Sequence, residues 1–473
     1  MAYKTTIGLE VHAELKTLTK MFCSCKNDPD EARPNWNICP VCTAQPGTLP
    51  VINKKAVEHV LRVGTAVGAD LADFTEWDRK NYFYPDIPKN YQISQYKYPL
   101  VANGTLAGVK LTRIHLEEDT GSSRHDVGDY SLIDYNRAGV PLMELVTEPV
   151  IHDAETAMRF AKELQLLLRS LGASDANMEK GEMRVEANIS ISETEEFGTK
   201  VEVKNLNSFK SVGDAIAFEI KRHAEVLARG EKVVQETRGW DENKSKTFSQ
   251  RKKESANDYR YFPDPDLPKM QLSEIDEFKN LKATLPELPW EKRDRLTNEY
   301  GFAPHVTELY VTDAVLGGFF VAVADIFDAQ HGTGKSTITL ASNYISSDVA
   351  ALAKTEGKGV GMLTPQNFCE LILMIEAGTL SSRGAKDTLA ILYKEGGSAK
   401  EVAESAGLLQ KSDMGALETI AKEAILANPV VVAEYKAGKV TSLQFLIGQG
   451  MKASRGSANP QVLATIFKQL LDK

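Results

Sequence analysis

The sequence has 473 residues, more than one hydrophobic core can hold, so two to four domains are expected. Its 42% hydrophobic and 26% charged residues are typical of a globular protein able to bury a core. The net charge of −9 excludes a protein that coats nucleic acid over its whole surface, although a local basic patch remains compatible with it. No run of eighteen apolar residues is present and the N-terminus lacks the apolar stretch of a signal peptide. We therefore expect a cytoplasmic protein without membrane attachment, or an organellar one that has lost a presequence.

The first predicted element is a strand at "TIGLEVHAEL", residues 6–15, where apolar and polar residues alternate. Its polar face carries Glu10, His12 and Glu14. Side chains two residues apart on a strand lie about 6.5–7 Å apart and point the same way, so they can share a magnesium or manganese ion if other carboxylates approach. A solvated strand face without an ion accounts for the same pattern equally well.

Four of the five cysteines, Cys23, Cys25, Cys39 and Cys42, follow in a C-x-C…C-x-x-C pattern. In a chain without a secretion signal this clustering favours a metal over disulfides. Two close thiolate pairs suit a tetrahedral structural Zn²⁺ with no open position for chemistry. The alternative is four reduced free thiols. Cys369, in the apolar segment "QNFCELILMI", is expected to be a buried small hydrophobic residue.

Two acidic motifs come next and supply further carboxylates. "HLEEDTG" contains Glu117, Glu118 and Asp119, and "PLMELVTEP" contains Glu144 and Glu148. The alternation of the first strand recurs in "MRVEANISI" and "TKVEVKNL", while "AETAMRFAKELQLLLRSLG" has the pattern of a helix that ends at a glycine. Long strands interleaved with helices predict an α+β fold around a largely antiparallel sheet.

The hydrophobic periodicity changes after the prolines of "LPELPWEKR", and the rest of the chain mostly has the periodicity of helices. We predict three domains: an α+β domain at 1–293, an all-helical domain at 294–405 and a small helical tail domain at 406–473. The tail is basic in an acidic chain. Its last 38 residues contain Lys436, Lys439, Lys452, Arg455, Lys468 and Lys473 against one acid, Asp472.

The segment "DAQHGTGKST" suggests a nucleotide site, because residues Ala329 to Ser336 match the relaxed consensus of a phosphate-binding loop. A working loop lies between a buried strand and a helix whose N-terminus faces the phosphates. The preceding segment is as compatible with a buried helix as with a strand, and the following one begins with β-branched residues, which start helices poorly. We therefore interpret this stretch as a turn between two helices.

Several long stretches resemble the B subunit of the tRNA-dependent amidotransferases. They are "IGLEVHAELKT", "DRKNYFYPDIPKNYQISQY", "HLEEDTG", "DYNRAGVPLMELVTEP", "VEVKNLNSF", "DYRYFPDPDLP" and "FLIGQGMKASRGSANPQ", and they occur in order along essentially the whole chain. The resemblance implies a cradle-shaped catalytic domain, followed by helical and tail domains, of which the tail binds tRNA. It also implies a heterotrimer with two partners, an amidase that releases ammonia from glutamine and a small third protein.

The implied reaction starts from tRNA(Gln) misacylated with glutamate or tRNA(Asn) misacylated with aspartate. ATP phosphorylates the side-chain carboxylate, and ammonia then displaces phosphate to form the amide. By this resemblance the Mg²⁺ ligands fall on His12, Glu118 and Glu144, with Glu10 beside them, although the spacing leaves open whether Glu117 or Glu118 faces the ion. The cysteines are the Zn²⁺ site that some members keep. Two rival functions are an independent metal-dependent phosphotransferase and a non-catalytic tRNA-binding scaffold.

Overall fold

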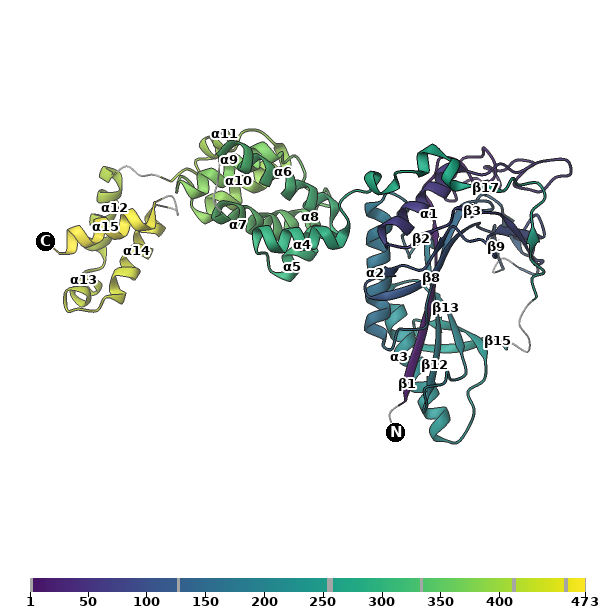
Figure 1. The fold of residues 1–473 in the computed structure, drawn as a ribbon. Coiled ribbons are helices and arrows are strands. Elements are labelled where there is room, and N and C mark those ends of the chain that lie inside the picture. Colours follow the sequence, from purple (N-terminus) through teal and green to yellow (C-terminus); the bar gives the residue numbers. More distant parts are fainter. Residues whose placement is uncertain are drawn as a thin grey trace. The chain divides into compact units, whose positions relative to one another are not determined.

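The computed structural model describes residues 3–125, 128–252, 258–331, 335–410, 414–454 and 458–472. Two compact units divide the chain, Met1–Pro289 and Trp290–Lys473 (Figure 1). The first unit contains a long sheet with helices, and the named elements of the second, within its described residues, are all helical. The predicted α+β fold, followed by helices, is confirmed.

The first unit is built on a ten-stranded sheet with the order β15-β14-β13-β12-β1-β11-β8-β6-β2, and β7 pairs with β8. Its strand pairs are antiparallel except for β13 and β14, which run parallel. The strands are β1 (Lys4–Glu14), β2 (Asp70–Leu71), β6 (Val101–Ala102), β7 (Thr105–Leu106), β8 (Val109–Glu118), β11 (Pro141–Thr147), β12 (Met183–Ser192), β13 (Val201–Leu206), β14 (Glu236–Asp241) and β15 (Lys246–Lys252). The N-terminal strand therefore lies inside the sheet, between β11 and β12.

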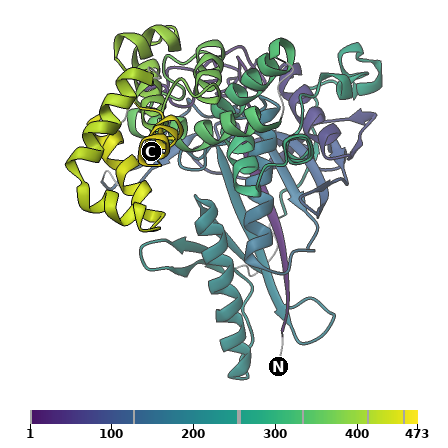
Figure 2. The ribbon, with the colours of Figure 1, turned by 90° about the vertical axis from the view of Figure 1, so that its left-hand side faces the viewer.

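The two faces of this sheet differ because its strands alternate. On β1 the side chains of Ile7, Leu9 and Val11 are at most 1% exposed, while the polar residues between them point to the other face. Three helices, α1 (Lys54–Ala66), α2 (Ala154–Ser170) and α3 (Phe209–Ala228), cover the apolar face, which Figure 2 views from the helix side. The polar face is left open for chemistry.

Short elements surround the open face. A three-stranded sheet has the order β16-β4-β5, and two pairs, β10-β9 and β17-β3, complete the unit. Their bounds are β3 (Phe74–Thr75), β4 (Asp78–Asn81), β5 (Tyr91–Ser94), β9 (Ser122–Arg124), β10 (Leu132–Asp134), β16 (Phe262–Pro263) and β17 (Met270–Gln271), and 3₁₀ turns follow at Leu272–Glu274, Asp276–Phe278 and Leu281–Thr284. The pairing of β4 with β16 joins segments about 180 residues apart in the sequence.

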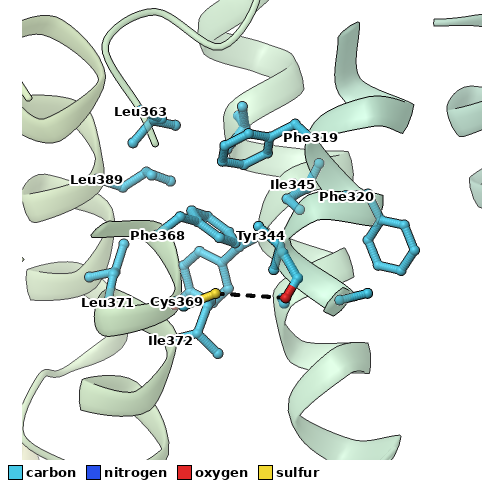
Figure 3. Close-up of a cluster of buried hydrophobic side chains, with 14 of the residues drawn as sticks. Phe319, Phe320, Tyr344, Ile345, Leu363, Phe368, Cys369, Leu371, Ile372 and Leu389 are labelled. Atoms are coloured by element: carbon cyan, nitrogen blue, oxygen red, sulfur yellow. Dashed lines mark hydrogen bonds between the residues drawn. The ribbon is translucent and has the colours of Figure 1, made fainter. Parts of the chain in front are cut away.

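The second unit has two separate hydrophobic cores. Helices α4 (Pro289–Tyr300), α5 (Pro304–Thr312), α6 (Ala314–His331), α7 (Lys335–Tyr344), a π-helical turn (Ile345–Val349), α8 (Ala350–Glu356), α9 (Pro365–Glu376), α10 (Ser382–Glu395) and α11 (Ala399–Ser405) form the first. Figure 3 shows Cys369 in this core, 3% exposed among Phe319, Phe368 and Leu371, so its predicted burial is confirmed. Helices α12 (Met414–Ala427), α13 (Pro429–Lys436), α14 (Thr441–Ala453) and α15 (Pro460–Leu471) form the second core, around Leu446, Leu463 and Phe467.

The segment that matches the phosphate-loop consensus lies at the junction of two helices of this unit. Helix α6 ends at His331 and α7 begins at Lys335, whose side chain is exposed, while residues 332–334 lie outside the described residues. The segment before the loop is thus helical, whereas a phosphate-binding loop follows a strand. Among the described helices none is by itself long and apolar enough to cross a membrane; the pair Pro304–Thr312 and Ala314–Ala329 reaches that composition only together, across a bend of 109°.

Candidate functional site

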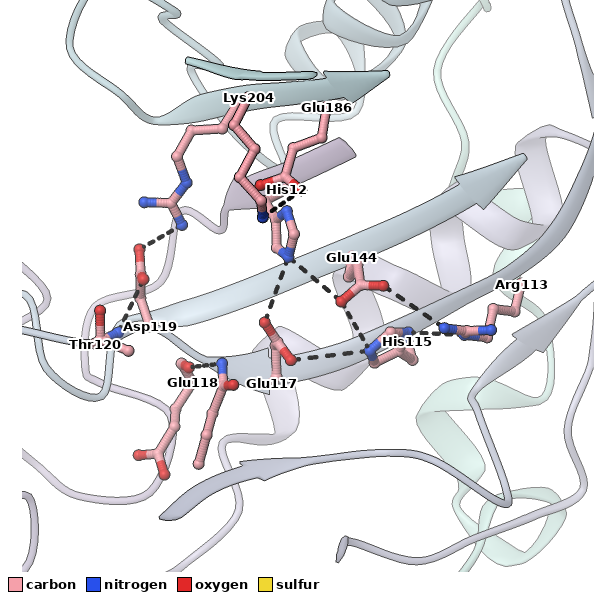
Figure 4. A network of polar contacts seen from close by, with 12 residues as sticks. His12, Arg113, His115, Glu117, Glu118, Asp119, Thr120, Glu144, Glu186 and Lys204 are labelled. Atoms are coloured by element: carbon pink, nitrogen blue, oxygen red, sulfur yellow. Dashed lines mark hydrogen bonds and ion pairs between the residues drawn. The ribbon is translucent and has the colours of Figure 1, made fainter. Parts of the chain in front are cut away.

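A row of chemically active side chains crosses the open face of the sheet. The register aligns His12 of β1 with Glu144 of β11, and Glu144 with His115 of β8. Residues that are directly opposite each other on antiparallel strands project on the same face, so the three side chains meet. Glu117 lies two residues beyond His115 on β8 and therefore joins them (Figure 4). Glu10 lies two residues before His12 on β1 and therefore projects on the same face.

The distances describe two overlapping groups that share one carboxylate. Oε2 of Glu144 lies 3.3 Å from Nε2 of His12 and 3.4 Å from Nε2 of His115. The ligand atoms of Glu10, His12 and Glu144 lie within 4.8 Å of one another, and so do those of His115, Glu117 and Glu144. Both groups combine carboxylate oxygens with imidazole nitrogen, which is a donor set for a divalent cation.

One atom of this cluster lacks the partner that a buried polar atom needs. Glu117 is 2% exposed, and its Oε2 has no hydrogen-bond partner among the described residues. The nearest imidazole nitrogens, on His12 and His115, lie 3.7 and 3.9 Å from its carboxylate, beyond hydrogen-bond distance. A buried unpartnered carboxylate oxygen is costly, and a cation placed between these groups would remove the cost.

The electrostatics of the cluster follow from this crowding of acids. Burial would lower the pKa of His12, but its hydrogen bond to Glu144 and the charges of Glu144 and Glu117 outweigh burial and raise this pKa to about 9. Burial would raise the pKa of Glu144, but the charge of His115 and its hydrogen bond hold that pKa well below its ordinary value. Burial and the charge of Glu144 raise the pKa of Glu10. Protonated His12 thus supplies positive charge among the acids, where positive charge is favoured.

Glu118, which the resemblance put at the ion, is turned to the other side of β8. Nζ of Lys89 donates to its two carboxylate oxygens at 2.8 and 2.5 Å, and the Ile93 backbone N–H donates to Oε1 at 3.0 Å. Adjacent residues of a strand project on opposite faces, so only one of Glu117 and Glu118 can face His12. The structure places Glu117 on the side that faces His12, and Glu118 on the side of Lys89.

Charged and aromatic side chains complete a cavity of about 590 Å³ over this row. Arg184 donates to Asp119 at 2.8 Å and Lys204 donates to Glu186 at 2.7 Å. The wall formed by residues 78–82 and 258–263 contributes one cation, Lys80, and the tyrosines Tyr82, Tyr259 and Tyr261. The cavity is therefore polar, with both signs of charge and with aromatic faces.

Sequence reasoning missed two members of the row, His115 and Arg113. Nε of Arg113 lies 3.4 Å from Nδ1 of His115, and its guanidinium lies 3.7 Å from Oε1 of Glu144. The signal that could have found His115 is its spacing of two from Glu117 in "HLEED", because that spacing puts both on one strand face.

The four clustered cysteines also meet in the structure. The Sγ atoms of Cys23, Cys25, Cys39 and Cys42 lie within 4.8 Å of one another, so this cluster can hold a metal ion. The hydrogen bond from Cys23 is the main cause that lowers the pKa of Cys42, to about 5, whereas burial raises the pKa of Cys25 to about 12. One thiolate is thus already favoured, as a metal ligand must be. A buried lysine, Lys20, lies beside the cluster and donates to the backbone oxygens of residues 37 and 135.

Comparison with protein families decides where the chain belongs. A model described as "GatB/GatE catalytic domain" matches residues 5–276, and one described as "GatB domain" matches residues 325–471. The chain belongs to the GatB/GatE family. In this family member, the catalytic-domain match contains the cavity, the row of strand side chains and the cysteine cluster.

Three full-length relatives share one name, which describes each as the B subunit of an aspartyl/glutamyl-tRNA(Asn/Gln) amidotransferase. The one from Dehalococcoides mccartyi is 42% identical over 489 residues, covering 100% of this chain and 99% of its own length. Those from Persephonella marina and a Picosynechococcus species are each 41% identical, over 483 and 497 residues, and each covers at least 99% of this chain. The family resemblance found in the sequence is therefore confirmed.

Proposed function

We propose that this chain phosphorylates and amidates the side-chain carboxylate of a misacylated tRNA, Glu-tRNA(Gln), Asp-tRNA(Asn) or both, with ATP and with ammonia released from glutamine by a partner. The observation that carries the proposal is the buried carboxylate–imidazole row on an open sheet face of a chain whose full-length relatives are named as the B subunit of an amidotransferase. A carboxylate is a poor electrophile, so it must first become an acyl phosphate with a good leaving group. Phosphoryl transfer needs positioning and charge neutralisation, which such a row can provide.

The residues proposed to hold the catalytic Mg²⁺ are Glu10, His12, Glu144 and, in place of Glu118, Glu117. When bound, the ion would neutralise phosphate oxygens and hold the phosphoryl donor in line. His12, which its raised pKa keeps protonated, would lose a proton when it binds the ion. Arg113, through its contacts with His115 and with Glu144, fixes the bridging carboxylate in place.

The second proposed metal is a structural Zn²⁺ at the four cysteines. The cluster provides four sulfur donors, and tetrahedral closure leaves no position for substrate. Lys20 donates to the backbone oxygens of Asn37, within the cysteine loop, and of Tyr135, which directly follows β10. The metal would therefore stabilise the cysteine loop and its connection to the segment after β10, and it would take no part in the chemistry.

The three predicted domains receive separate roles in this proposal. Residues 1–293 carry both chemical steps, 294–405 form the helical domain, and 406–473 bind the tRNA body through phosphate contacts, which suits a basic tail. Arg455 and Lys473 of that tail lie outside the described residues. An amidase and a small third protein complete a heterotrimer with this chain, which we place in the cytoplasm.

The test is Glu144→Ala in the assembled complex, with transamidation and glutaminase activity measured separately. Loss of the shared ligand should abolish formation of the acyl phosphate, while basal glutamine hydrolysis survives because that chemistry belongs to the amidase partner. Excess free ammonium should not restore product. Restoration by ammonium would place the lesion in ammonia delivery and would contradict the metal-site assignment.

The two rival functions predict other outcomes of the same assays. An independent phosphotransferase would turn over ATP with a small-molecule acceptor in the absence of the partner proteins and tRNA. A tRNA-binding scaffold would bind tRNA and support no ATP-dependent phosphorylation. Assays of the purified chain alone, and then with both partners and misacylated tRNA, separate the three functions.

A further inference from the structure

One cation of the cavity lacks a counter-charge. Four lysine and arginine side chains line the cavity in its described part, and three of them have a carboxylate partner: Arg113 with Glu144, Arg184 with Asp119 and Lys204 with Glu186. The fourth, Lys80, has no hydrogen bond or ion pair from its ammonium to any described residue. Such a group, half-buried in a polar cavity, is available to a ligand.

Aromatic rings hold this ammonium in position. Nζ of Lys80 lies 5.7 Å from the ring centroid of Tyr82 and 5.3 Å from that of Tyr259. Both contacts are within the range of cation–π attraction, which orients a cation and leaves its hydrogen-bond donors unused. The three N–H donors of Lys80 therefore remain for an acceptor that enters the cavity.

The same cavity contains a buried carboxylate oxygen without a hydrogen-bond partner among the described residues. Glu117, with its buried orphan oxygen, lines the same cavity as Lys80, and their charged atoms do not form an ion pair. Burial would lower the pKa of Lys80, but the charge of Glu117 is the largest influence that raises it, so the ammonium stays protonated. A ligand that satisfies both groups must present positive charge to Glu117 and negative charge to Lys80.

We propose, resting on the function proposed above, that Lys80 binds the terminal phosphoryl group of ATP, which lies between this ammonium and the divalent cation held at Glu117 and Glu144. A metal-bound phosphate has the required polarity, because its cation faces the carboxylates and its oxygens face the lysine. In the transfer step, an oxygen of the substrate carboxylate forms a bond to the γ-phosphorus. The bond from that phosphorus to the bridging oxygen breaks, and ADP leaves with the electron pair. Lys80 neutralises phosphate charge and transfers no proton.

The experiment compares a nucleotide that has a γ-phosphoryl group with one that lacks it. Binding of β,γ-imido-ATP and of AMP to the full-length chain with Mg²⁺ would be measured by calorimetry for wild type, Lys80→Met, Lys80→Arg and Lys97→Met. Lys97 is the matched control, because its Nζ also lies over a tyrosine ring, 5.0 Å from the centroid of Tyr98, but its side chain is exposed and does not line the cavity.

Lys80→Met should weaken binding of the imido nucleotide by about tenfold or more, with AMP affinity within about twofold of wild type. Lys80→Arg should lose less, since it keeps the charge, and Lys97→Met should bind both nucleotides as wild type does. Unchanged imido-ATP binding by a folded Lys80→Met variant, or equal weakening of both nucleotides, would overturn the assignment. If Lys80→Met raised only the KM for aminoacyl-tRNA, Lys80 would face the substrate carboxylate instead. Failure of wild type to bind either nucleotide would refute the proposed function itself.

Discussion

The neighbouring residues Glu117 and Glu118 allow a pair of matched perturbations with opposite expected effects. In Glu118→Gln, the amide keeps one oxygen for the Ile93 N–H but can no longer balance the charge of Lys89. The side chains of Lys89 and Glu118 are only 6% and 7% exposed. Removal of one partner from a buried ion pair costs about 3–5 kcal/mol, so the free energy of unfolding of the first unit should fall by about that amount. Divalent-ion affinity should change little, since Glu118 points away from the cluster.

Glu117→Gln should show the reverse. Its Oε2 has no hydrogen-bond partner to lose, and the substitution removes one negative charge from a group of crowded acids. We expect the unfolding free energy to change by less than about 1 kcal/mol. The same substitution removes a proposed ligand, so Mn²⁺ or Mg²⁺ affinity should fall by about tenfold or more and phosphorylation should be lost.

The assay combines urea unfolding with ion binding on the same preparations. Tryptophan fluorescence reports mainly on the first unit, which contains three of the four tryptophans, among them Trp77, which is 1% exposed. Mn²⁺ binding is followed by electron paramagnetic resonance. The reasoning would be refuted if Glu118→Gln abolished Mn²⁺ binding at unchanged stability, because Glu118 and not Glu117 would then face the ion. Equal effects of both variants would show that the two sides of β8 are not separable.

Four further changes have defined outcomes. Cys39→Ser should release the bound zinc, measured by mass spectrometry of the metal, and lower stability while leaving the phosphotransfer ligands intact; absence of zinc in wild type expressed with zinc supplied would refute this. Lys335→Ala should leave ATP-dependent activation almost unchanged, and a loss of more than about a hundredfold (about 2.7 kcal/mol) would reinstate the loop as a nucleotide site. Deletion of residues 406–473 should raise the KM for tRNA and make residual binding less dependent on salt, whereas an unchanged KM would remove the tail from recognition. Burial would raise the pKa of Glu219, but His223, whose Nε2 lies 3.1 Å from the carboxylate, and hydrogen bonds from Arg222 lower that pKa to about 2. The ionised carboxylate therefore stabilises the folded state fully above its unfolded pKa near 4.5, and this stabilisation is lost as the pH falls toward 2. Glu219→Gln should lower the free energy of unfolding by about 3 kcal/mol at pH 7, and its difference from wild type in urea unfolding should shrink below about pH 4.5. A difference independent of pH would contradict this.

Properties that depend on neighbours in the chain were predictable from the sequence. The period-two alternation at residues 6–15 sufficed to predict a strand with Glu10 and His12 on its polar face, because that periodicity is local. The spacing of the cysteines likewise predicted their meeting. The phosphate-loop spelling could be set aside because its flanking segments lacked the pattern of a strand followed by a helix.

The choice between Glu117 and Glu118 could not be made from the sequence. It depends on the phase of β8 against β11, and that phase is set by hydrogen bonds to residues about thirty positions away. The role of Lys80 was hidden for the same reason, since β4 obtains its neighbour β16 from about 180 residues further along the chain. Burial of the Glu117 oxygen is likewise a property of the assembled sheet.

The place of β1 within the sheet has a consequence for synthesis of the protein. His12 emerges early, but its neighbours across the sheet are Glu144 on one side and Arg184 on the other. At 5–20 residues per second, a ribosome needs on the order of 7 to 26 s to add the roughly 130 residues from His12 to Glu144, and during that time β1 has both edges unpaired. The polar residues between its apolar ones reduce the hazard of pairing with other chains, because a strand with charges on one face is a poor template for aggregation. The same side chains proposed for catalysis would thus protect the nascent strand until its partners arrive.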